Sequence, residues 1–137
     1  TAANGEKICG VFNGCFYTDP TTSKPTWSNY YPGSIAASDI MAFVIDDPSV
    51  VYKIDVNDDL NTTFIFQNFD VTNVTGSTTT GISKVQLNRS TNDIKITQAV
   101  RVIDVSQDPD NEDQTASNVK ALVVINNHFY GNKGAGI

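Results

Sequence analysis

The sequence predicts an all-β fold, a single compact β-barrel or sandwich of about six to eight strands with long loops. Two observations carry this prediction. Thr, Val, Ile, Asn and Asp are abundant whereas Leu and Ala are sparse, which is typical of short strands joined by polar turns. Turn signals recur every roughly 8–15 residues without a sustained helical period. A chain of 137 residues is long enough for one domain with its own core, so residues 1–137 are expected to form a single β domain.

The first forty residues predict one or two strands followed by a long loop. Apolar residues between 6 and 17 favour strands, broken near Gly10 or at Asn13-Gly14, because Asn-Gly is a strong turn dipeptide. Residues 18–39 contain three prolines and several turn dipeptides, so we expect an irregular loop there. Its aromatic residues must pack either on the domain's own core or on a neighbour; they are Trp27, Tyr30 and Tyr31.

The middle of the chain predicts a hairpin and then a less certain segment. The continuous apolar run at 40–47 favours a buried strand, and 50–56 alternates like a half-buried strand, with a turn at 46–49 joining the two. Residues 62–72 fit either a strand or a helix of about two turns, and their aromatic content favours the strand. A polar loop at 76–81, a short strand at 82–87 and a turn at 88–93 are expected next.

The last third of the chain is its most apolar part and predicts the centre of the fold. Two long β-rich runs, 94–105 and 118–130, flank an acidic loop at 108–113. The second run is expected to belong to the body of the domain as far as Ile125, and to be offered to a neighbour from Asn126 onward. The glycine-rich tail, 131–137, is expected to be flexible unless a partner holds it.

The charge argues against nucleic acid and membrane surfaces as partners. The formal net charge is −6, and the nine Lys and Arg residues are scattered singly rather than clustered. Phosphate-rich partners require basic clusters, so both partner classes are disfavoured. No apolar run approaches the roughly 20 residues of a transmembrane helix. Because the sequence shows neither a signal-peptide pattern nor an initiator Met, we expect it to begin inside a longer product or after processing.

The cysteines and acidic clusters offer little chemistry. If Cys9 and Cys15 lie on one strand, they are about 20 Å apart, too far to bridge unless the chain turns at Asn13-Gly14, so reduced thiols are expected. The acidic loops at 55–59 and 108–113 are possible calcium ligands, but they lack the spacing of an EF-hand and read more simply as solvated turns. We expect no metal and no cofactor.

The only histidine, His128, is a weak candidate for catalysis. A Ser–His–Asp site would require it, but no Gly-x-Ser-x-Gly motif marks a nucleophile. A hydrogen-bonded surface or interface residue is the simpler interpretation. We therefore predict no catalytic residue and no enzymatic activity.

Several segments, in order and in spacing, resemble a family of small head structural proteins of tailed bacteriophages. The C-terminal matches are STTTGIS at 77–83, LN at 87–88, IKI at 94–96 and NVKALVVINNHFY at 118–130. The run DDPSVVYKI at 46–54 is similar to a motif of the same family, and 5–19 looks like its Gly-Val-x-x-Gly strand and following turn.

The resemblance implies a capsid decoration, or cement, protein that stabilises the phage head by bridging major capsid proteins. It further implies a homotrimer on the outer capsid surface of the virion, assembled in the host cytoplasm. A cement protein needs a rigid body with exposed anchors; the candidate contact residues are Trp27, Tyr30, Tyr31, His128, Phe129 and Tyr130. Two alternatives stay open: a phage tail or fibre subunit, and a secreted carbohydrate-binding β-sandwich that stacks sugars on its aromatic residues.

Overall fold

The predicted all-β class is confirmed by the computed structural model, which describes residues 6–132 and 134–136. Two antiparallel sheets of three and five strands form a sandwich-like fold, and a small hairpin completes it. Of the described strands, eight have at least four residues, in line with the prediction. The elements are β1 (Val11–Thr18), β2 (Pro25–Ser28), β3 (Met41–Ile45), β4 (Tyr52–Asp55), η1 (Thr62–Phe64), β5 (Asn68–Thr72), β6 (Gln86–Asp93), β7 (Val100–Val105), η2 (Pro109–Asn111), β8 (Lys120–Ile125), β9 (Asn127–His128) and β10 (Gly131–Asn132).

The five-stranded sheet holds the hydrophobic core, and we call it, with the β9–β10 hairpin, the body. Its strand order is β4-β8-β7-β5-β6, so the two apolar runs of the last third, β7 and β8, lie side by side at its centre. Alternate residues of β8 are buried, as the period of a strand dictates. The fully buried core side chains include Val56, Leu60, Phe69, Leu87, Val102 and Val123.

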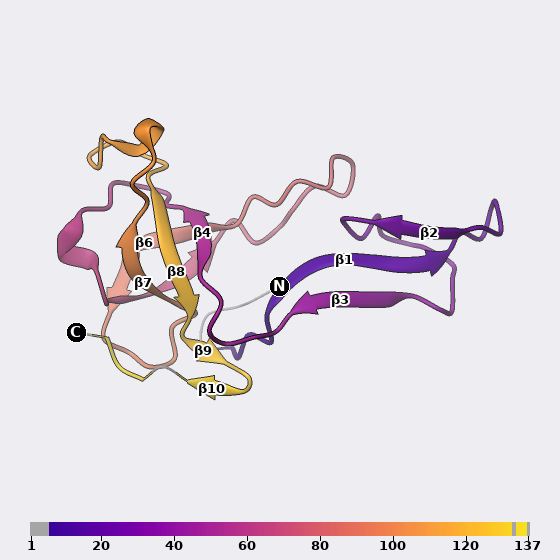
Figure 1. The fold of residues 1–137 in the computed structure, drawn as a ribbon, viewed down its shortest axis with the longest axis horizontal. Coiled ribbons are helices and arrows are strands. Elements are labelled where there is room, and N and C mark those ends of the chain that lie inside the picture. Colours follow the sequence, from indigo (N-terminus) through magenta and orange to yellow (C-terminus); the bar gives the residue numbers. More distant parts are fainter. Residues whose placement is uncertain (1–5, 133, 137) are drawn as a thin grey trace.

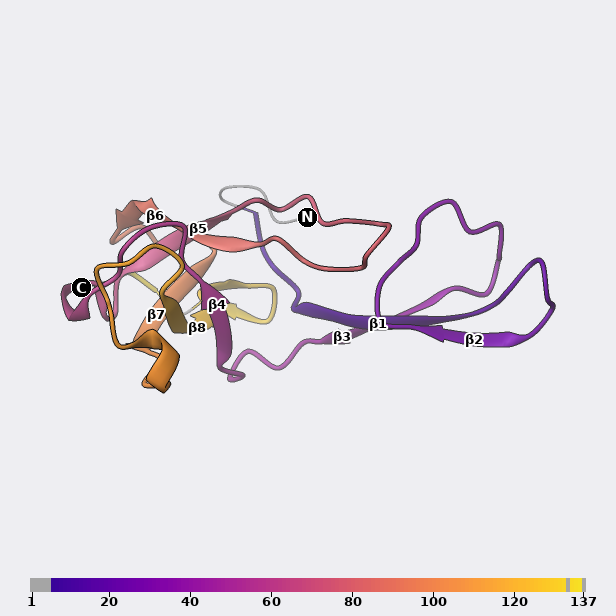
Figure 2. The same ribbon diagram turned by 90° about the horizontal axis from the view of Figure 1, so that it is seen from above.

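The three-stranded sheet, in the order β2-β1-β3, extends to one side of the body (Figures 1 and 2). We call residues 11–45 the arm. Two contacts fasten the ends of the arm to the body. Ile8, just before β1, forms a parallel bridge with His128, and its amide donates to the Asn127 carbonyl at 2.9 Å. At the end of β3, the Ile45 carbonyl accepts from the Tyr52 hydroxyl at 3.2 Å.

The arm differs from the prediction in two places. The chain does not turn at Asn13-Gly14; β1 continues through it with a β-bulge, because the extra residue is absorbed between Phe12 and Gly14. The expected loop at 18–39 contains a strand, since β2 pairs with β1 along residues 25–28. Pro25 is tolerated because it begins a strand at the sheet's edge, where a missing amide donor costs little.

The predicted hairpin at 40–56 is wrong, although both strands exist. β3 pairs with β1 in the arm, whereas β4 pairs with β8 in the body, so residues 46–51 connect two sheets. The predicted burial of the first strand is also wrong, because every residue of β3 is exposed. The expected alternation of the second strand is confirmed: Tyr52 and Ile54 are half-buried and Val56 is fully buried.

Three further boundaries differ from the prediction. Residues 62–72 are neither one strand nor one helix, because the short 3-10 helix η1 precedes β5. The expected strand at 82–87 begins only at Gln86, and the expected turn at 88–93 lies within β6. The first long run starts as a strand only at Val100, and residues 94–99 form a loop instead.

The described part of the C-terminal tail contacts the body, and the flexibility expected for 131–137 stays a prediction. Gly131–Asn132 pairs with β9. The Arg101 guanidinium donates to the carbonyls of Gly134 at 2.8 Å and Ala135 at 2.5 Å, and to the buried Asn68 side chain at 3.0 Å. These charge-assisted bonds hold the backbone that a tail rich in glycine would otherwise leave free. Residues 133 and 137 lie outside the described part of the chain.

Within residues 6–132 and 134–136, the search for a helix both long and apolar enough to span a bilayer finds none.

Candidate functional site

One face of the arm is apolar and open to solvent. Residues opposite one another in a sheet share a face, and the register places Val11 beside Ile45, Gly14 beside Phe43, and Phe16 between Met41 and Trp27. The bulge makes this possible, because an unbulged strand would put Val11 and Gly14 on opposite faces. We call this set the apolar face: Val11, Phe16, Trp27, Met41, Phe43 and Ile45.

The aromatic centre of the apolar face is built over a glycine. The Trp27 and Phe43 rings, from the two outer strands, approach to 5.1 Å between centroids at an interplanar angle of 55°. Gly14 lies beneath them on the middle strand, and a Cβ placed there would come within 2.5 Å of the Trp27 ring. Trp27 is nevertheless 51% exposed and Phe43 44% exposed. The two rings therefore form a raised apolar ridge that the chain itself leaves uncovered.

A loop covers the opposite face of the arm at its outer part, whereas Phe12 and Val44 on the same face are 43% and 42% exposed. Cys15 and Tyr17 point there and are buried. The loop at 29–40 crosses them: the Tyr30 carbonyl accepts from the Cys15 thiol at 3.6 Å and from the Ser28 hydroxyl at 2.5 Å. Figure 2 shows the arm edge-on, with this loop rising on one side of the sheet only. The two faces of the arm therefore differ: the chain's own loop covers Cys15 and Tyr17 on one, and nothing in the described chain covers the apolar face on the other.

The three aromatic residues of the 18–39 segment lie in different settings. Trp27 is on the apolar face. Tyr31 is 45% exposed on the loop. The Tyr30 ring is half-buried against Gly81 of the body's 73–85 loop, where an added Cβ would come within 2.3 Å of the ring. These residues are expected to pack on the domain's own core or on a neighbour. Tyr30 packs within the chain, whereas Trp27 is mostly exposed, and its packing on a neighbour stays a prediction.

The second group of candidate contact residues is divided between surface and interior. Phe129 and Tyr130 form the turn between β9 and β10 and are 63% and 64% exposed. His128 is 1% exposed, and its Nδ1 accepts from the Tyr130 backbone amide at 3.0 Å. This burial corrects the expectation that the segment from Asn126 onward is offered to a neighbour. Within residues 126–130, Phe129 and Tyr130 are the exposed residues, and Asn126, Asn127 and His128 are buried.

The buried part of that segment has a structural explanation. The side-chain amide of Asn126 donates to the carbonyls of Ile96 at 3.0 Å and Gln98 at 3.1 Å. The Asn127 amide donates to the carbonyls of Glu6 at 3.1 Å and Thr97 at 3.3 Å. Buried amides that satisfy loop carbonyls in this way fix irregular backbone against a sheet. From the sequence, the polar side chains of Asn126 and Asn127 suggested a surface segment, and nothing indicated that they would bind loop carbonyls in the interior.

The acidic loop at 108–113 is fastened by lysines from neighbouring strands. Lys53 donates to Asp108 and Lys120 donates to Asp110, each at 2.5 Å. The Lys53 ammonium, followed by the Ser106 hydroxyl, lowers the pKa of Asp108, and the Lys120 ammonium lowers the pKa of Asp110. The side-chain amide of Asn111 donates to the Ser106 carbonyl beneath the loop. Among the residues that the structure describes, no group of three or more His, Cys, Asp or Glu side chains is placed to hold a metal ion.

The structure has no disulfide between the two cysteines: Cys9 is exposed and Cys15 is buried on the covered face of the arm.

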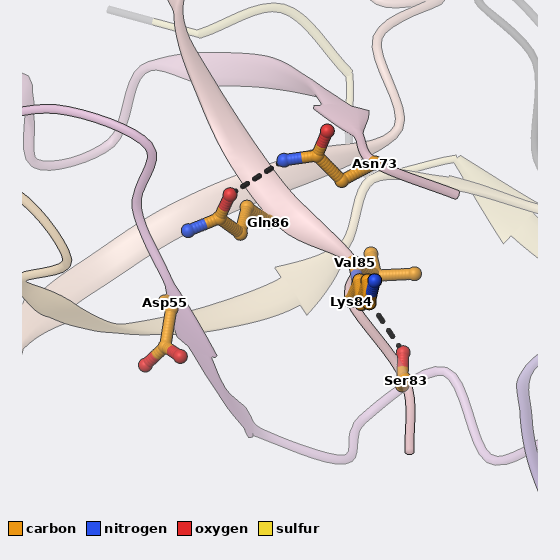
Figure 3. Close-up of a pocket in the computed structure, with 6 residues that line it drawn as sticks. All are labelled: Asp55, Asn73, Ser83, Lys84, Val85 and Gln86. Atoms are coloured by element: carbon orange, nitrogen blue, oxygen red, sulfur yellow. Dashed lines mark hydrogen bonds between the residues drawn. The ribbon is translucent and has the colours of Figure 1, made fainter. Parts of the chain in front are cut away.

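A shallow depression lies where the 73–85 loop leaves the edge of the body (Figure 3). Two hydrogen bonds join residues of its lining. The Asn73 side-chain amide donates to the Gln86 side chain at 2.6 Å, and the Ser83 hydroxyl accepts from the Val85 amide at 3.3 Å. Figure 3 shows Asp55, at the end of β4, away from Ser83, which lies in the loop before β6. The lining residues do not include the histidine, so this arrangement offers no hydroxyl activated by an imidazole.

Comparisons with protein-family models, with curated proteins and with solved structures find no match to this chain. The apolar face and the resemblance seen in the sequence are therefore the observations that bear on function.

Proposed function

We propose that this protein is a non-enzymatic virion structural subunit, a decoration protein that bridges major capsid proteins on the outer surface of a tailed-phage head. The observation that carries the proposal is the apolar face. Large exposed apolar patches mark surfaces that meet another protein. Here the patch lies on an arm that extends beyond a body with its own closed core (Figure 1), which is a suitable shape for reaching a neighbouring subunit.

The size of the apolar face supports attachment within a lattice rather than a tight pair in solution. Taking about 150–250 Å² for a whole large side chain, the exposed fractions at five of its residues leave an area on the order of 400 Å². Covering it contributes about 10 kcal/mol at 25 cal/mol/Å². Association costs about 4–15 kcal/mol, so one such contact is weak alone. Several linked contacts, as in a homotrimer bound to a capsid, convert weak contacts into stable attachment.

The exposed Phe129-Tyr130 turn is a second anchor in this proposal. It lies on the body rather than on the arm, and its two rings meet edge to face at 5.8 Å between centroids. Two separate aromatic anchors suit a subunit that touches more than one neighbour. The acidic composition, with a net charge of −6, suits an outer surface that does not bind the packaged DNA.

Copy number and position on purified particles test the proposal. A decoration protein is present in hundreds of copies on the head, whereas a tail or fibre subunit is present in tens and copurifies with detached tails. Binding of the free protein to a sugar array, without any particle association, would support the carbohydrate-binding alternative and contradict the proposal.

A matched pair of variants tests the role of the apolar face. Phe43→Ser removes an aromatic side chain that is 44% exposed on the apolar face, and Phe66→Ser removes one that is 48% exposed on the body. We expect Phe43→Ser to lower occupancy on capsids at least about tenfold. Truncating an interface anchor typically costs about 1.4 kcal/mol or more of binding free energy, which corresponds to that factor. Phe66→Ser is expected to bind like the unaltered protein. Equal occupancy for the two variants would remove the apolar face from the proposal.

A further inference from the structure

The outer edge of β3 is the less protected of the arm's two edges. β3 pairs with β1 on one side, and within the described residues no strand lies on its other side. All five of its residues are exposed, and none is charged or proline. The opposite edge, β2, is shorter and begins with Pro25, which is a common way to blunt an edge. An apolar edge strand without such protection is a template for pairing with another chain.

Carboxylates flank this edge strand at both ends. Asp39 precedes it, and Asp46 and Asp47 follow it. Local hydrogen bonds fix two of the three. The Asp39 carboxylate accepts from the Thr18 hydroxyl at 2.7 Å, and Asp47 accepts from the Ser49 amide at 2.7 Å. The strand is therefore an apolar segment between two fixed sources of negative charge.

These charges oppose a second copy of the chain as the occupant. In an antiparallel pair centred on Phe43, Asp39 of one copy lies opposite Asp47 of the other, and the symmetry repeats this contact at the other end. Like charges directly opposite one another destabilise a strand pair. An occupant with Lys or Arg on both sides of an apolar stretch meets the same carboxylates favourably.

We propose that β3 accepts an extended segment of a partner protein as a fourth strand of the arm, and that this segment alternates apolar residues between flanking Lys or Arg residues. The added strand would place its alternate side chains beside Met41, Phe43 and Ile45 and so continue the apolar face. Backbone hydrogen bonds then supply the attachment, and the flanking charges select the partner. The inference rests on the proposed function only for the identity of the partner as a capsid protein.

Synthetic peptides test the strand addition with the full chain. The probe is a short peptide of alternating valine and threonine with lysines at both ends. We expect it to bind, to protect the Met41–Ile45 amides from hydrogen exchange, and to bind more weakly as salt is added. A peptide with glutamates in place of the lysines is expected to bind about tenfold more weakly, the effect of two or three cross-strand charge pairs.

A backbone-modified peptide separates strand addition from simple apolar contact. The lysine-flanked peptide with N-methyl groups on alternate residues keeps its side chains and charges but lacks the amide donors along one edge. We expect it not to bind. Binding equal to that of the unmodified peptide, equal binding of the glutamate-flanked peptide, or an absence of protection at Met41–Ile45 would each overturn the inference.

Charge variants of the protein test whether Asp46 and Asp47 select the lysine-flanked peptide. Asp46→Asn combined with Asp47→Asn is expected to weaken the lysine-flanked peptide about tenfold. The matched control, Asp58→Asn with Glu112→Gln, removes the same charge from exposed positions on the body and is expected to leave binding unchanged. Equal losses in both variants would show a general effect of net charge and contradict the inference.

The inference and the proposed function fail in different ways. A protein that decorates capsids equally well with and without the Asp46 and Asp47 charges, and that binds none of the peptides at β3, keeps the proposed function and loses the inference. A protein that binds the lysine-flanked peptide at β3 but is absent from every head particle keeps the inference and loses the proposed function.

Discussion

Gly14→Ala is expected to loosen the arm and spare the body. Gly14 has a φ of +135°, a region that costs a side-chain-bearing residue about 1–3 kcal/mol. Its new methyl group would meet the Trp27 ring at 2.5 Å and the Ser28 carbonyl oxygen at 2.8 Å. The second contact is with backbone and has little room to relax, so overpacking adds about 1–3 kcal/mol. The arm should therefore lose about 2–6 kcal/mol of local stability.

Trp27 makes this loss measurable, because it is the only tryptophan in the chain and it lies on the arm. In a urea titration, Trp27 fluorescence is expected to change at a lower midpoint in Gly14→Ala than in the unaltered protein. Amide hydrogen exchange should show lost protection in Val11–Thr18. Protection in Val100–Val105, at the centre of the body, should persist because no arm residue belongs to the core cluster.

Gly131→Ala is the matched control. Gly131 does not have a positive φ, and an added Cβ there meets nothing within 4 Å, so we expect almost no effect. An unchanged Trp27 transition in Gly14→Ala would refute the close packing over Gly14. Equal loss of protection in the arm and in the body would refute the idea that the body, which contains the hydrophobic core, is stable independently of the arm.

Three further predictions concern the body. Arg101→Ala should lower the free energy of unfolding by about 2–4 kcal/mol, because it leaves the buried Asn68 oxygen and two tail carbonyls without that donor. The Gly136 amide should then exchange faster with solvent, and unchanged exchange at Gly136 would contradict this. Phe69→Ala should cost about 3–5 kcal/mol, since the ring is fully buried edge-on to Phe64, and a loss below about 1 kcal/mol would show that the core closes over the gap. Lys53→Ala should raise the pKa of Asp108 toward its usual value, as followed by carboxyl NMR. In the unaltered protein the lowered pKa of Asp108 contributes stability above pH 3.8, and this contribution is lost as the pH falls below that value. An Asp108 titration that is the same in the variant as in the unaltered protein would rule out the ion pair.

The body was largely predictable from the sequence because its strands obey local rules. β8 alternates buried and half-buried residues, and β4 shows the same period of two. The tail was not predictable in the same way. No local pattern in its glycines indicates that Arg101, more than thirty residues away in the sequence, donates hydrogen bonds to its carbonyls. β6 also escaped prediction, because residues of weak strand preference pair there with β5 through tertiary contacts.

The error at β3 is informative about function. A continuous apolar run predicts burial, since a half-exposed strand alternates instead. The structure exposes every residue of β3. Met41, Phe43 and Ile45 lie on the open apolar face, and the loop over the other face covers Cys15 but leaves Val44 42% exposed. The apolar sequence of β3 is thus typical of a buried strand, whereas the single chain leaves β3 exposed. We interpret this mismatch as the contribution of a partner, which is the basis of both proposals.

A cryo-electron microscopy map of a particle that contains this chain tests the central claim most directly. The account predicts density for the chain on the outer surface of the head, with Trp27 and Phe43 of the apolar face buried against a neighbouring protein. A map that places the chain on the head with these two side chains facing solvent would contradict the account, as would a map that places the chain elsewhere on the particle.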